Sequence, residues 1–329
     1  MSNPNLKILL KEYEQNRLQK QLELENKLNN FYIKNPDISN INDKINRISI
    51  EISKTILLNK DSDKINKLNL ELDKFKQKKQ KLLNNLNIKQ DFFEPDYNCK
   101  HCHDSGYLIN DNRFMCTCLK QKLLNLQYNK SNISSLEYQN FDNFNINLFS
   151  NEIDENKYNS NISPKENLEK IKNLSLKFIE NFDDPQEKNL LFTGNTGIGK
   201  TYLTNCIANE LLKHGKTVLY QTAPVMLDAI LDYRFGKNNE FNYTDLLNAD
   251  LLIIDDLGTE NSNNMKYSEL FNILNTRLLN QNNHVTKTII STNLSLNHLF
   301  KTYDERIFSR LVGHYNICRF FGEDLRYKK

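Results

Sequence analysis

Apolar residues recur every three or four positions along the first ninety residues, which is the spacing of one face of a helix. No helix breaker interrupts the Leu-, Glu-, Lys- and Gln-rich stretch between Pro4 and Pro36, so it predicts one long helix. A second helix is expected after Pro36 and a third from about Ser62. Their apolar stripes are Ile41, Ile45, Ile48, Ile52 and Ile56, and then Ile65, Leu68, Leu72, Phe75, Leu82 and Leu86.

Lys79 stands where an apolar residue would continue the last stripe, so the predicted helical seam is imperfect. Two interpretations of the region stay open. It forms a small antiparallel bundle or hairpin, or it is a module whose apolar stripe docks on a partner protein. The surrounding lysines, which are typical of a solvated face, also offer a nucleic-acid contact: Lys74, Lys76, Lys78, Lys79 and Lys81.

From about residue 165 the pattern changes to helices that alternate with short apolar runs, as in an α/β domain with a parallel sheet. The polar, Asn-rich residues 131–164 are interpreted as a linker. Its apolar patch is expected to dock on the next domain: Phe141, Phe144, Leu148 and Phe149. The expected organisation is a helical region at 1–90, a cysteine-rich knuckle at 91–130, this linker, and an α/β domain at 165–329.

Charge is distributed unevenly over the 329 residues, although the formal net charge is only +3. Residues 1–90 contain 18 Lys and Arg against 11 Asp and Glu, and the remainder contains 26 against 30. A basic arm therefore precedes a mildly acidic body, and near-neutrality does not exclude a role on DNA. No run of 18 apolar residues is present, so we expect a cytoplasmic protein with no membrane partner and with reduced thiols.

Four of the six cysteines lie within twenty residues: Cys99, Cys102, Cys116 and Cys118. A Cys-x2-Cys turn and an extended Cys-x-Cys pair can each aim two thiolates at one ion. Four thiolates suit tetrahedral Zn²⁺ with no open position, so the site would be structural. Replacement of one ligand by His101 or His103 stays an alternative, as do unliganded thiols and a redox pair. Cys206 and Cys318 are expected in the core.

The strand-like run from Asn189 is followed by Gly194-Asn-Thr-Gly-Ile-Gly-Lys-Thr, which matches the phosphate-loop pattern in full, and then by a helix that ends near Gly215. Backbone N–H groups of the loop surround a β-phosphate at a helix N-terminus. Lys200 is expected to reach the β- and γ-phosphates, and Thr201 is expected to bind Mg²⁺. The nucleotide-binding residues are therefore Gly194, Asn195, Thr196, Gly197, Ile198, Gly199, Lys200 and Thr201.

Two further apolar runs end in polar side chains. Leu251-Leu-Ile-Ile precedes Asp255 and Asp256, and Thr288-Ile-Ile-Ser-Thr precedes Asn293. Ligands of open α/β sheets bind outside the carboxyl ends of the strands. Asp255 is thus expected to hold Mg²⁺, Asp256 to orient or activate the attacking water, and Asn293 to contact that water or the γ-phosphate.

Arg306 and Arg310 are four residues apart on a predicted helix and therefore share a face. A guanidinium that reaches a neighbouring subunit's site would stabilise charge in the transition state of phosphoryl transfer. A surface ion pair is the alternative for each.

These motifs, together with Glu-Arg-Ile-Phe-Ser-Arg-Leu-Val-Gly, resemble the AAA+ ATPases of the DnaC/DnaI type, which load the bacterial replicative helicase. The resemblance covers residues 165–329, and the cysteine segment is similar to the form found in low-GC Gram-positive bacteria. It implies a RecA-like parallel sheet with flanking helices, without a separate lid. By this resemblance Arg310 is the arginine finger, Arg306 a secondary contact, and Arg326 sensor 2.

The resemblance further implies ATP-dependent action coupled to self-association through the ATP sites, with ATP, Mg²⁺ and Zn²⁺ as cofactors. The N-terminal region would bind the replicative helicase hexamer, and the ATPase domain would contact single-stranded DNA. Candidates for that DNA contact are Tyr233, Arg234, Phe235 and Lys237. Asp256 stands where many AAA+ proteins have Glu, so slow hydrolysis is expected. The alternatives are an IstB-type transposition helper, a small-molecule kinase, and a nucleotide-binding scaffold without turnover.

Overall fold

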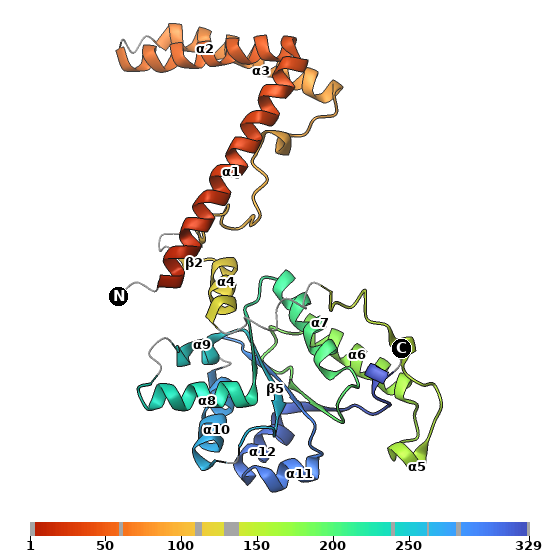
Figure 1. The fold of residues 1–329 in the computed structure, drawn as a ribbon. Helices are drawn as coiled ribbons and strands as arrows, with labels where there is room; N and C mark the ends of the chain where they lie inside the picture. Colours follow the sequence, from red (N-terminus) through yellow and green to blue (C-terminus); the bar gives the residue numbers. More distant parts are fainter. Residues whose placement is uncertain are drawn as a thin grey trace. The chain divides into compact units, whose positions relative to one another are not determined.

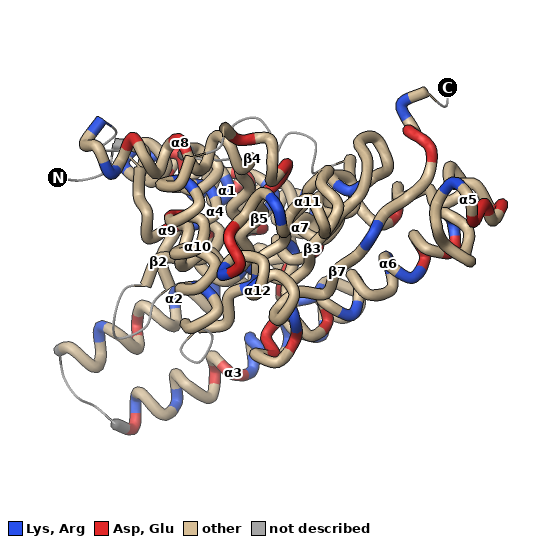
Figure 2. Tube along the Cα trace, turned by 90° about the horizontal axis from the view of Figure 1, so that it is seen from below, with Lys and Arg blue, Asp and Glu red and all other residues tan. Residues whose placement is uncertain are grey.

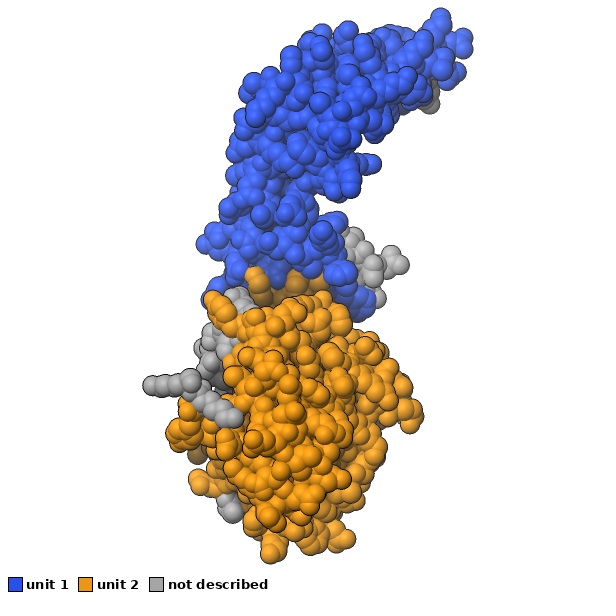
Figure 3. All heavy atoms as spheres, turned by 90° about the vertical axis from the view of Figure 1, so that its right-hand side faces the viewer, with its two compact units in different colours: residues 1–114 blue, residues 115–329 orange. Residues whose placement is uncertain are grey.

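A computed structural model describes residues 4–58, 62–108, 114–127, 138–237, 241–261, 263–280 and 284–327. The chain divides into two compact units, residues 1–114 and residues 115–329, which Figure 3 colours separately. Figure 1 gives the order of the elements. None of the described helices combines the length and the apolar character that a membrane span requires.

Unit 1 begins with three helices at the predicted places: α1 (Pro4–Lys34), α2 (Pro36–Leu58) and α3 (Ser62–Asn85). Helices α2 and α3 lie side by side as a hairpin (Figure 1). Ile41 and Ile48 of α2 are buried, as predicted, but Ile56 is exposed and Thr55 occupies the buried position instead. The 3.6-residue repeat explains this correction, because spacings of three and four from Ile52 lead to Thr55 and Ile56, and only one of them can face the partner helix.

Phe31 anchors a small aromatic core at the junction of the helices. Its ring packs edge-on against Phe92 and Phe93, with centroids 5.2 and 6.0 Å away. These two residues belong to the 3-10 helix η1 (Gln90–Phe93), and Ile38 and Leu83 complete the cluster. Edge-to-face packing of this kind adds to the free energy gained by burying the rings.

The cysteine-rich segment contains two short strands, β1 (Tyr107–Leu108) and β2 (Phe114–Met115), and the helix α4 (Thr117–Gln127). Cys118 lies in the first turn of α4, so Cys116 and Cys118 are not the extended pair that their spacing predicted, because the helix already begins at Thr117. Part of this segment, residues 109–113, lies outside the described residues, as do residues 128–137, which include the beginning of the predicted linker.

Unit 2 is built on a five-stranded parallel sheet in the order β4-β5-β6-β3-β7. Its strands are β3 (Asn189–Thr193), β4 (Val218–Thr222), β5 (Leu251–Leu257), β6 (Lys287–Thr292) and β7 (Tyr315–Arg319). Nearly continuous burial of β3, β5 and β6 is typical of strands covered on both faces. The predicted parallel sheet with flanking helices is therefore confirmed.

Alternate strand residues point to opposite faces and form two cores. Leu190, Phe192 and Ile253 pack against α6 (Pro164–Glu180) and α7 (Lys200–Lys213). Leu191 and Ile254 pack on the other face, against Leu124 of α4 and five further helices. Those helices are α8 (Ala223–Arg234), α9 (Tyr243–Asn248), α10 (Asn264–Leu279), α11 (Leu296–Thr302) and α12 (Glu305–His314). Cys206 and Cys318 are buried, as predicted.

The edge strand β4 is covered by α4. The Gln121 side chain donates to the carbonyl of Val218 and accepts from its N–H, at 2.9 and 2.7 Å. This amide takes the place of a neighbouring strand, which protects the sheet edge from pairing with another chain.

Residues 138–163 run over the α6–α7 face and include η3 (Ile146–Leu148) and α5 (Glu155–Tyr158). Phe149 is buried in that core, and Phe141 and Phe144 pack against it. The apolar patch of the predicted linker thus docks on the sheet domain as expected, except that Leu148 remains 45% exposed.

Arg277 of α10 is fully buried and connects α9, the loop before β5, and β6. Its guanidinium donates to the carbonyls of Leu246, Ala249 and Lys287 at 2.7–2.9 Å and to the hydroxyl of Thr288 at 3.1 Å. Burial lowers its pKa to about 10. A planar group with five donors is suited to satisfy several carbonyls at once, including those at the end of a short helix.

Candidate nucleotide site

The phosphate loop joins β3 to α7 and contains three glycines with positive φ, at 194, 197 and 199. A Cβ on Gly194 would lie 2.3 Å from the carbonyl oxygen of Phe320, so the sequence tolerates no side chain there. Gly199 is the N-cap of α7, and its left-handed backbone turns the chain into the helix. The loop therefore presents backbone N–H groups and a helix N-terminus to the same space, which is an anion-binding arrangement.

Lys200 lies at the start of α7 and is only 6% exposed. Its ammonium group donates to the carbonyls of Gly194 and Asn195 at 2.7 and 2.5 Å, and to Asn293 Oδ1 at 2.9 Å. Burial lowers the Lys200 pKa to about 8, although Asp256 and Asp255 act in the opposite direction. The structure thus brings together the lysine and the asparagine that the sequence placed 93 residues apart.

Asp255, at the carboxyl end of β5, is held by hydroxyl groups from both neighbouring strands. Tyr220 of β4 donates to its Oδ2, and Ser291 of β6 donates to its Oδ1. Thr201 Oγ1 lies 3.4 Å from the same Oδ2. Burial and the nearby Asp255 charge both raise the Tyr220 pKa, so this phenol remains a donor. Tyr220 and Ser291 were not predicted from the sequence, because only the register of the sheet places them beside the acid.

Asp256 has a left-handed backbone, with φ of 55°. It lies where the β5–β6 register shifts between Ile254 and Leu257, and its N–H donates to Ser291 Oγ and to Asp255 Oδ1 at 3.2 and 3.1 Å. A bulge of this kind changes the direction of a side chain at the end of a strand. Burial and the Asp255 charge raise the Asp256 pKa, which Lys200 counteracts. A raised pKa next to a strained backbone is a mark of a functional carboxylate.

Thr201, Asp255 and Asp256 fit the oxygen chemistry of Mg²⁺, which takes one or two protein oxygens and several from phosphate and water. The hydroxyl of Thr201 and the carboxylate of Asp255 would hold the ion beside the phosphates. When bound, the ion would neutralise charge on the β- and γ-phosphate oxygens.

A cavity of about 530 Å³ opens over the loop and is lined by Lys200, Thr201, Asp256 and Asn293. The aromatic rings of Phe144, Phe149 and Tyr202 also line it and form an apolar wall, together with the amide of Gln139. An apolar and aromatic wall next to a phosphate cradle has the chemistry of a nucleotide site, with a flat base against the rings. The apolar spacing at 141–149 was the only signal in the sequence for this wall.

The segment after β7 lies on the phosphate loop. Leu325 N–H donates to the Gly197 carbonyl at 2.9 Å, and a Cβ on Gly197 would lie 1.9 Å from Asp324 Oδ1. Arg326 lines the cavity, but its guanidinium is paired with Asp324, with Nη2 and Oδ2 2.5 Å apart. The structure therefore places Arg326 at the site and gives it a carboxylate partner.

Arg306 and Arg310 lie on α12, and neither is among the described residues that line the cavity. The exposed Arg306 pairs with Asp304 at 2.7 Å. Arg310 Nε donates to Asn275 at 3.0 Å, and both guanidiniums lie over the Phe271 ring. They are neighbours on one helix face, as the spacing predicts, and the chain does not bring them to its own nucleotide cavity.

The sulfur atoms of Cys99, Cys102, Cys116 and Cys118 all lie within 4.8 Å of one another. A tetrahedral zinc ion with bonds of about 2.3 Å separates its sulfur ligands by about 3.8 Å, so the donor set fits such an ion. The buried Asp104 carboxylate accepts from the N–H groups of Asn98 and Cys99 at 2.9 and 2.8 Å and orders the first turn.

Neither histidine of this segment belongs to the sulfur cluster. His103 is exposed, with its ring stacked on Tyr97 at a centroid distance of 5.4 Å, and His101 is exposed as well. The four cysteines are therefore the ligand set that the structure supports.

Residues 139–329 match the sequence profile of the IstB-like ATP-binding proteins. The match covers more than half of the chain and includes every predicted nucleotide-binding residue. The chain belongs to the IstB-like ATP-binding family. This is a family of ATP-binding proteins, and the residues that line the cavity all lie within the matched range of this IstB-like protein.

Among curated proteins, this IstB-like chain is similar to the replicative helicase loader DnaC of Escherichia coli strain K12. The two are 32% identical over 136 residues, which are 41% of this chain and 54% of DnaC. The chain thus spans about half the length of this relative. It is also similar to the DnaC of Buchnera aphidicola from Acyrthosiphon pisum, with 26% identity over 145 residues, 43% of this chain and 57% of that protein.

A crystal structure of the DnaC helicase loader superposes with a TM-score of 0.42 and 22% identity, and covers 47% of this chain and 90% of that one. A crystal structure of DnaI superposes with a TM-score of 0.40 and 23% identity, and covers 50% of this chain and 86% of that one.

Proposed function

We propose that this protein is an ATP-hydrolysing loader of the replicative DNA helicase, acting in the cytoplasm when replication is initiated or restarted. The observation that carries the proposal is the convergence of Lys200, Asn293, Asp255 and Thr201 at the carboxyl ends of three parallel strands. Membership of an ATP-binding family and the 32% identity with a helicase loader support it.

In this proposal the phosphate loop binds ATP, Lys200 contacts the β- and γ-phosphates, and Thr201 and Asp255 hold Mg²⁺. Asp256, whose raised pKa suits a group that accepts a proton, orients the attacking water together with Asn293. Aspartate is one methylene shorter than glutamate, so a water must approach more closely, and we expect slow turnover that acts as a switch.

We assign Arg310 as an arginine finger that acts on the site of a second copy of the chain, with Arg306 as its neighbour and Arg326 as a contact to bound nucleotide. Self-association then completes the ATP site. Arg326 would exchange its Asp324 partner for phosphate, since both are acceptors that suit a guanidinium.

The remaining regions keep their predicted roles in this proposal. Residues 1–90 dock on the helicase, residues 91–130 bind a structural zinc ion, residues 131–164 connect, and residues 165–329 hydrolyse ATP and contact single-stranded DNA. The exposed aromatic rings of Tyr233 and Phe235 at the end of α8 offer stacking surfaces for DNA. Arg234 beside them is paired with Glu269 at 3.0 Å.

The test of the finger is a mixing experiment with two inactive variants. A chain with Lys200→Ala cannot bind ATP at its own site but still offers Arg310 to a neighbouring chain. A chain with Arg310→Ala keeps its own ATP site but cannot complete the site of a neighbour. Each variant alone should hydrolyse ATP at least about tenfold more slowly than the wild type, and an equimolar mixture should recover activity. Lys301→Ala, at an exposed position on the neighbouring helix, is the control. A mixture no faster than its components would overturn action in trans.

The helicase assignment is tested separately by capture of the cognate replicative helicase on the full-length protein, with and without ATP, followed by measurement of helicase delivered to single-stranded DNA. The family also suits a transposition helper, since the matching profile carries the IstB name. Capture of a transposase in place of the helicase would establish that alternative.

A further inference from the structure

Besides the nucleotide cavity of unit 2, the structure has a cavity of about 370 Å³ in unit 1, where α2, α3 and the segment around η1 meet. Its described lining includes three lysines and two glutamines and contains no carboxylate. The polar lining residues are Lys76, Lys79, Gln80, Lys89 and Gln90, and the apolar floor is Ile45, Leu83, Ile88 and Phe93.

Of the three lysines that line this cavity, Lys79 is the most buried. It occupies the position at which an apolar residue would continue the α3 stripe, and it is half-buried. Its ammonium group donates to Asn42 Oδ1 at 2.6 Å and lies 5.4 Å from the centroid of the Phe93 ring. Burial lowers its pKa, with no carboxylate to counteract it. A partly desolvated cation that has no carboxylate partner among the described residues costs some folding free energy, and a bound anion would reduce that cost.

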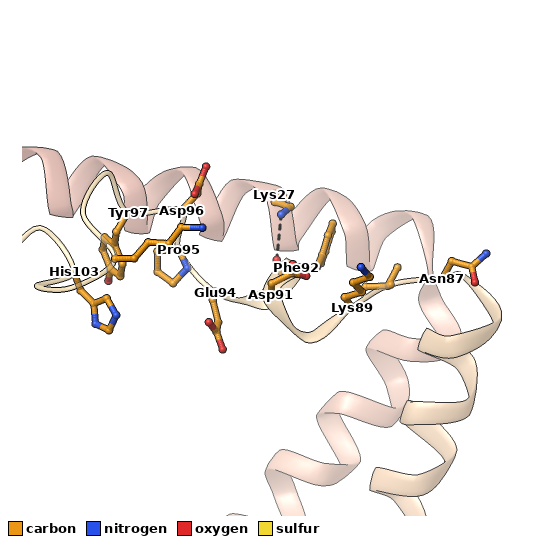
Figure 4. Close-up of a pocket in the computed structure, with 12 residues that line it drawn as sticks. Lys27, Asn87, Lys89, Asp91, Phe92, Glu94, Pro95, Asp96, Tyr97 and His103 are labelled. Carbon is orange, nitrogen blue, oxygen red and sulfur yellow. Dashed lines mark hydrogen bonds between the residues drawn. The ribbon is translucent and has the colours of Figure 1, made fainter. Parts of the chain in front are cut away.

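A neighbouring cavity in the same unit provides a contrast. It measures about 910 Å³, and its lining balances Lys27, Lys89 and Lys100 with three acids, Asp91, Glu94 and Asp96 (Figure 4). In Figure 4 Lys27 points at Phe92, whose carbonyl it contacts at 3.2 Å. The charges of this lining balance, whereas the lining of the smaller cavity has an excess of positive charge, and Lys89 lines both.

The second half of α3 adds to the positive charge around the smaller cavity. From Lys74 to Asn85 the helix has five lysines and no acidic residue, whereas its first half mixes both signs (Figure 2). A carboxylate has one negative charge and two oxygens, which leaves two of the three lysines without compensation. A phosphate group has up to two charges and three strong acceptor oxygens, and this matches the lysine and glutamine donors better.

We propose that this lysine cavity binds a phosphate group, which either the backbone of a single-stranded nucleic acid or a free polyphosphate can supply. Lys76, Lys79 and Lys89 contact the phosphate oxygens, and Gln80 and Gln90 donate further hydrogen bonds. The site lies in unit 1 and uses none of the ATP-site residues, so it stands independently of the loader assignment.

The chain has no tryptophan, so Phe93→Trp introduces a single fluorescent reporter into the cavity. The full-length protein should also carry Lys200→Ala, which removes phosphate binding at the ATP site from the signal. Pyrophosphate, twelve-residue oligothymidylate and polyglutamate are then titrated. We expect saturable fluorescence changes with a phosphate ligand and none with polyglutamate at equal charge concentration.

Lys79→Met in this background should weaken phosphate binding at least about tenfold, whereas Lys67→Met, an exposed lysine of the same helix, should not. For oligothymidylate the slope of log K against log salt should become shallower by about 0.7 for each lost phosphate contact. Binding of oligothymidylate alone identifies nucleic acid as the source, and binding of pyrophosphate identifies a smaller phosphate ligand; both support the site.

Acetylation of lysines in the wild-type chain, read by mass spectrometry, provides a measurement without substitutions in the cavity. Saturating pyrophosphate or twelve-residue oligothymidylate should protect Lys76, Lys79 and Lys89 but not Lys67. Preference for polyglutamate, equal effects of Lys79→Met and Lys67→Met, or absence of both a saturable signal and protection would each overturn the proposal.

Discussion

Lys200 is expected to take up a proton when ATP binds above about pH 8. Its ammonium group is buried, and this burial lowers its pKa to about 8. The phosphates of bound ATP stabilise the charged form and return the pKa toward that of a free lysine. Binding at a pH between the two values must therefore draw a proton from the buffer.

The magnitude follows from the pKa of about 8. At pH 9 about nine tenths of Lys200 is neutral, so binding takes up about 0.9 proton, and at pH 7 about 0.1. The affinity for ATP should fall about tenfold from pH 7 to pH 9, which is about 1.4 kcal/mol. Folding of the nucleotide-free chain responds in the opposite sense. The unfolded chain binds more protons between about pH 8 and 10.5, so this group makes the free energy of unfolding rise with pH in that window.

The assay is titration calorimetry with Mg²⁺ and ATP in pairs of buffers that differ in ionisation enthalpy, at pH 7 and pH 9. Lys200→Arg is the matched control, because a guanidinium remains charged throughout this range. Its proton uptake should be near zero at both pH values. Equal uptake by the wild type at pH 7 and 9, or the same uptake by Lys200→Arg, would refute the reasoning.

Three further outcomes are expected. Tyr220→Phe removes an O–H donor from the buried Asp255 carboxylate, and urea denaturation should show a loss of about 1.5–3 kcal/mol in the free energy of unfolding; a loss below about 0.5 kcal/mol would contradict the contact. Arg277→Met leaves several buried carbonyls without a donor and should lower the free energy of unfolding by at least about 4 kcal/mol. The control Arg234→Met, at a surface position, should lower it by less than about 1 kcal/mol. Elemental analysis should find one zinc ion per chain, and Cys99→Ser should lose it while ATP binding is retained; less than half an equivalent in the wild type would count against the site.

The parts of the fold that depend on local sequence could be predicted from it. Pro4 and Pro36 mark the beginnings of α1 and α2, because proline suits the first turn of a helix and cannot continue the preceding one. The phosphate loop could be predicted because its glycines have a fixed spacing, and each of them meets a local backbone requirement.

The missed features depend on register between distant strands. Tyr220 and Ser291 reach Asp255 from positions 35 and 36 residues away in sequence, through the alignment of β4, β5 and β6. Nothing near Tyr220 in the sequence distinguishes it from an ordinary core residue of a buried strand. The left-handed backbone of Asp256 likewise arises from a register shift between two strands, which no single segment encodes.

The hydrogen bonds of Lys200 limit how a phosphate can contact its ammonium group. An ammonium group has three protons, and all three are already donated, to Gly194, Asn195 and Asn293. A phosphate can therefore gain a contact with Lys200 only by displacing one of these acceptors. Of the three, Asn293 is a side chain that can rotate, whereas the two carbonyls are fixed in the loop. In the proposed mechanism, a γ-phosphate that takes the place of Asn293 on Lys200 would free this amide to orient the attacking water.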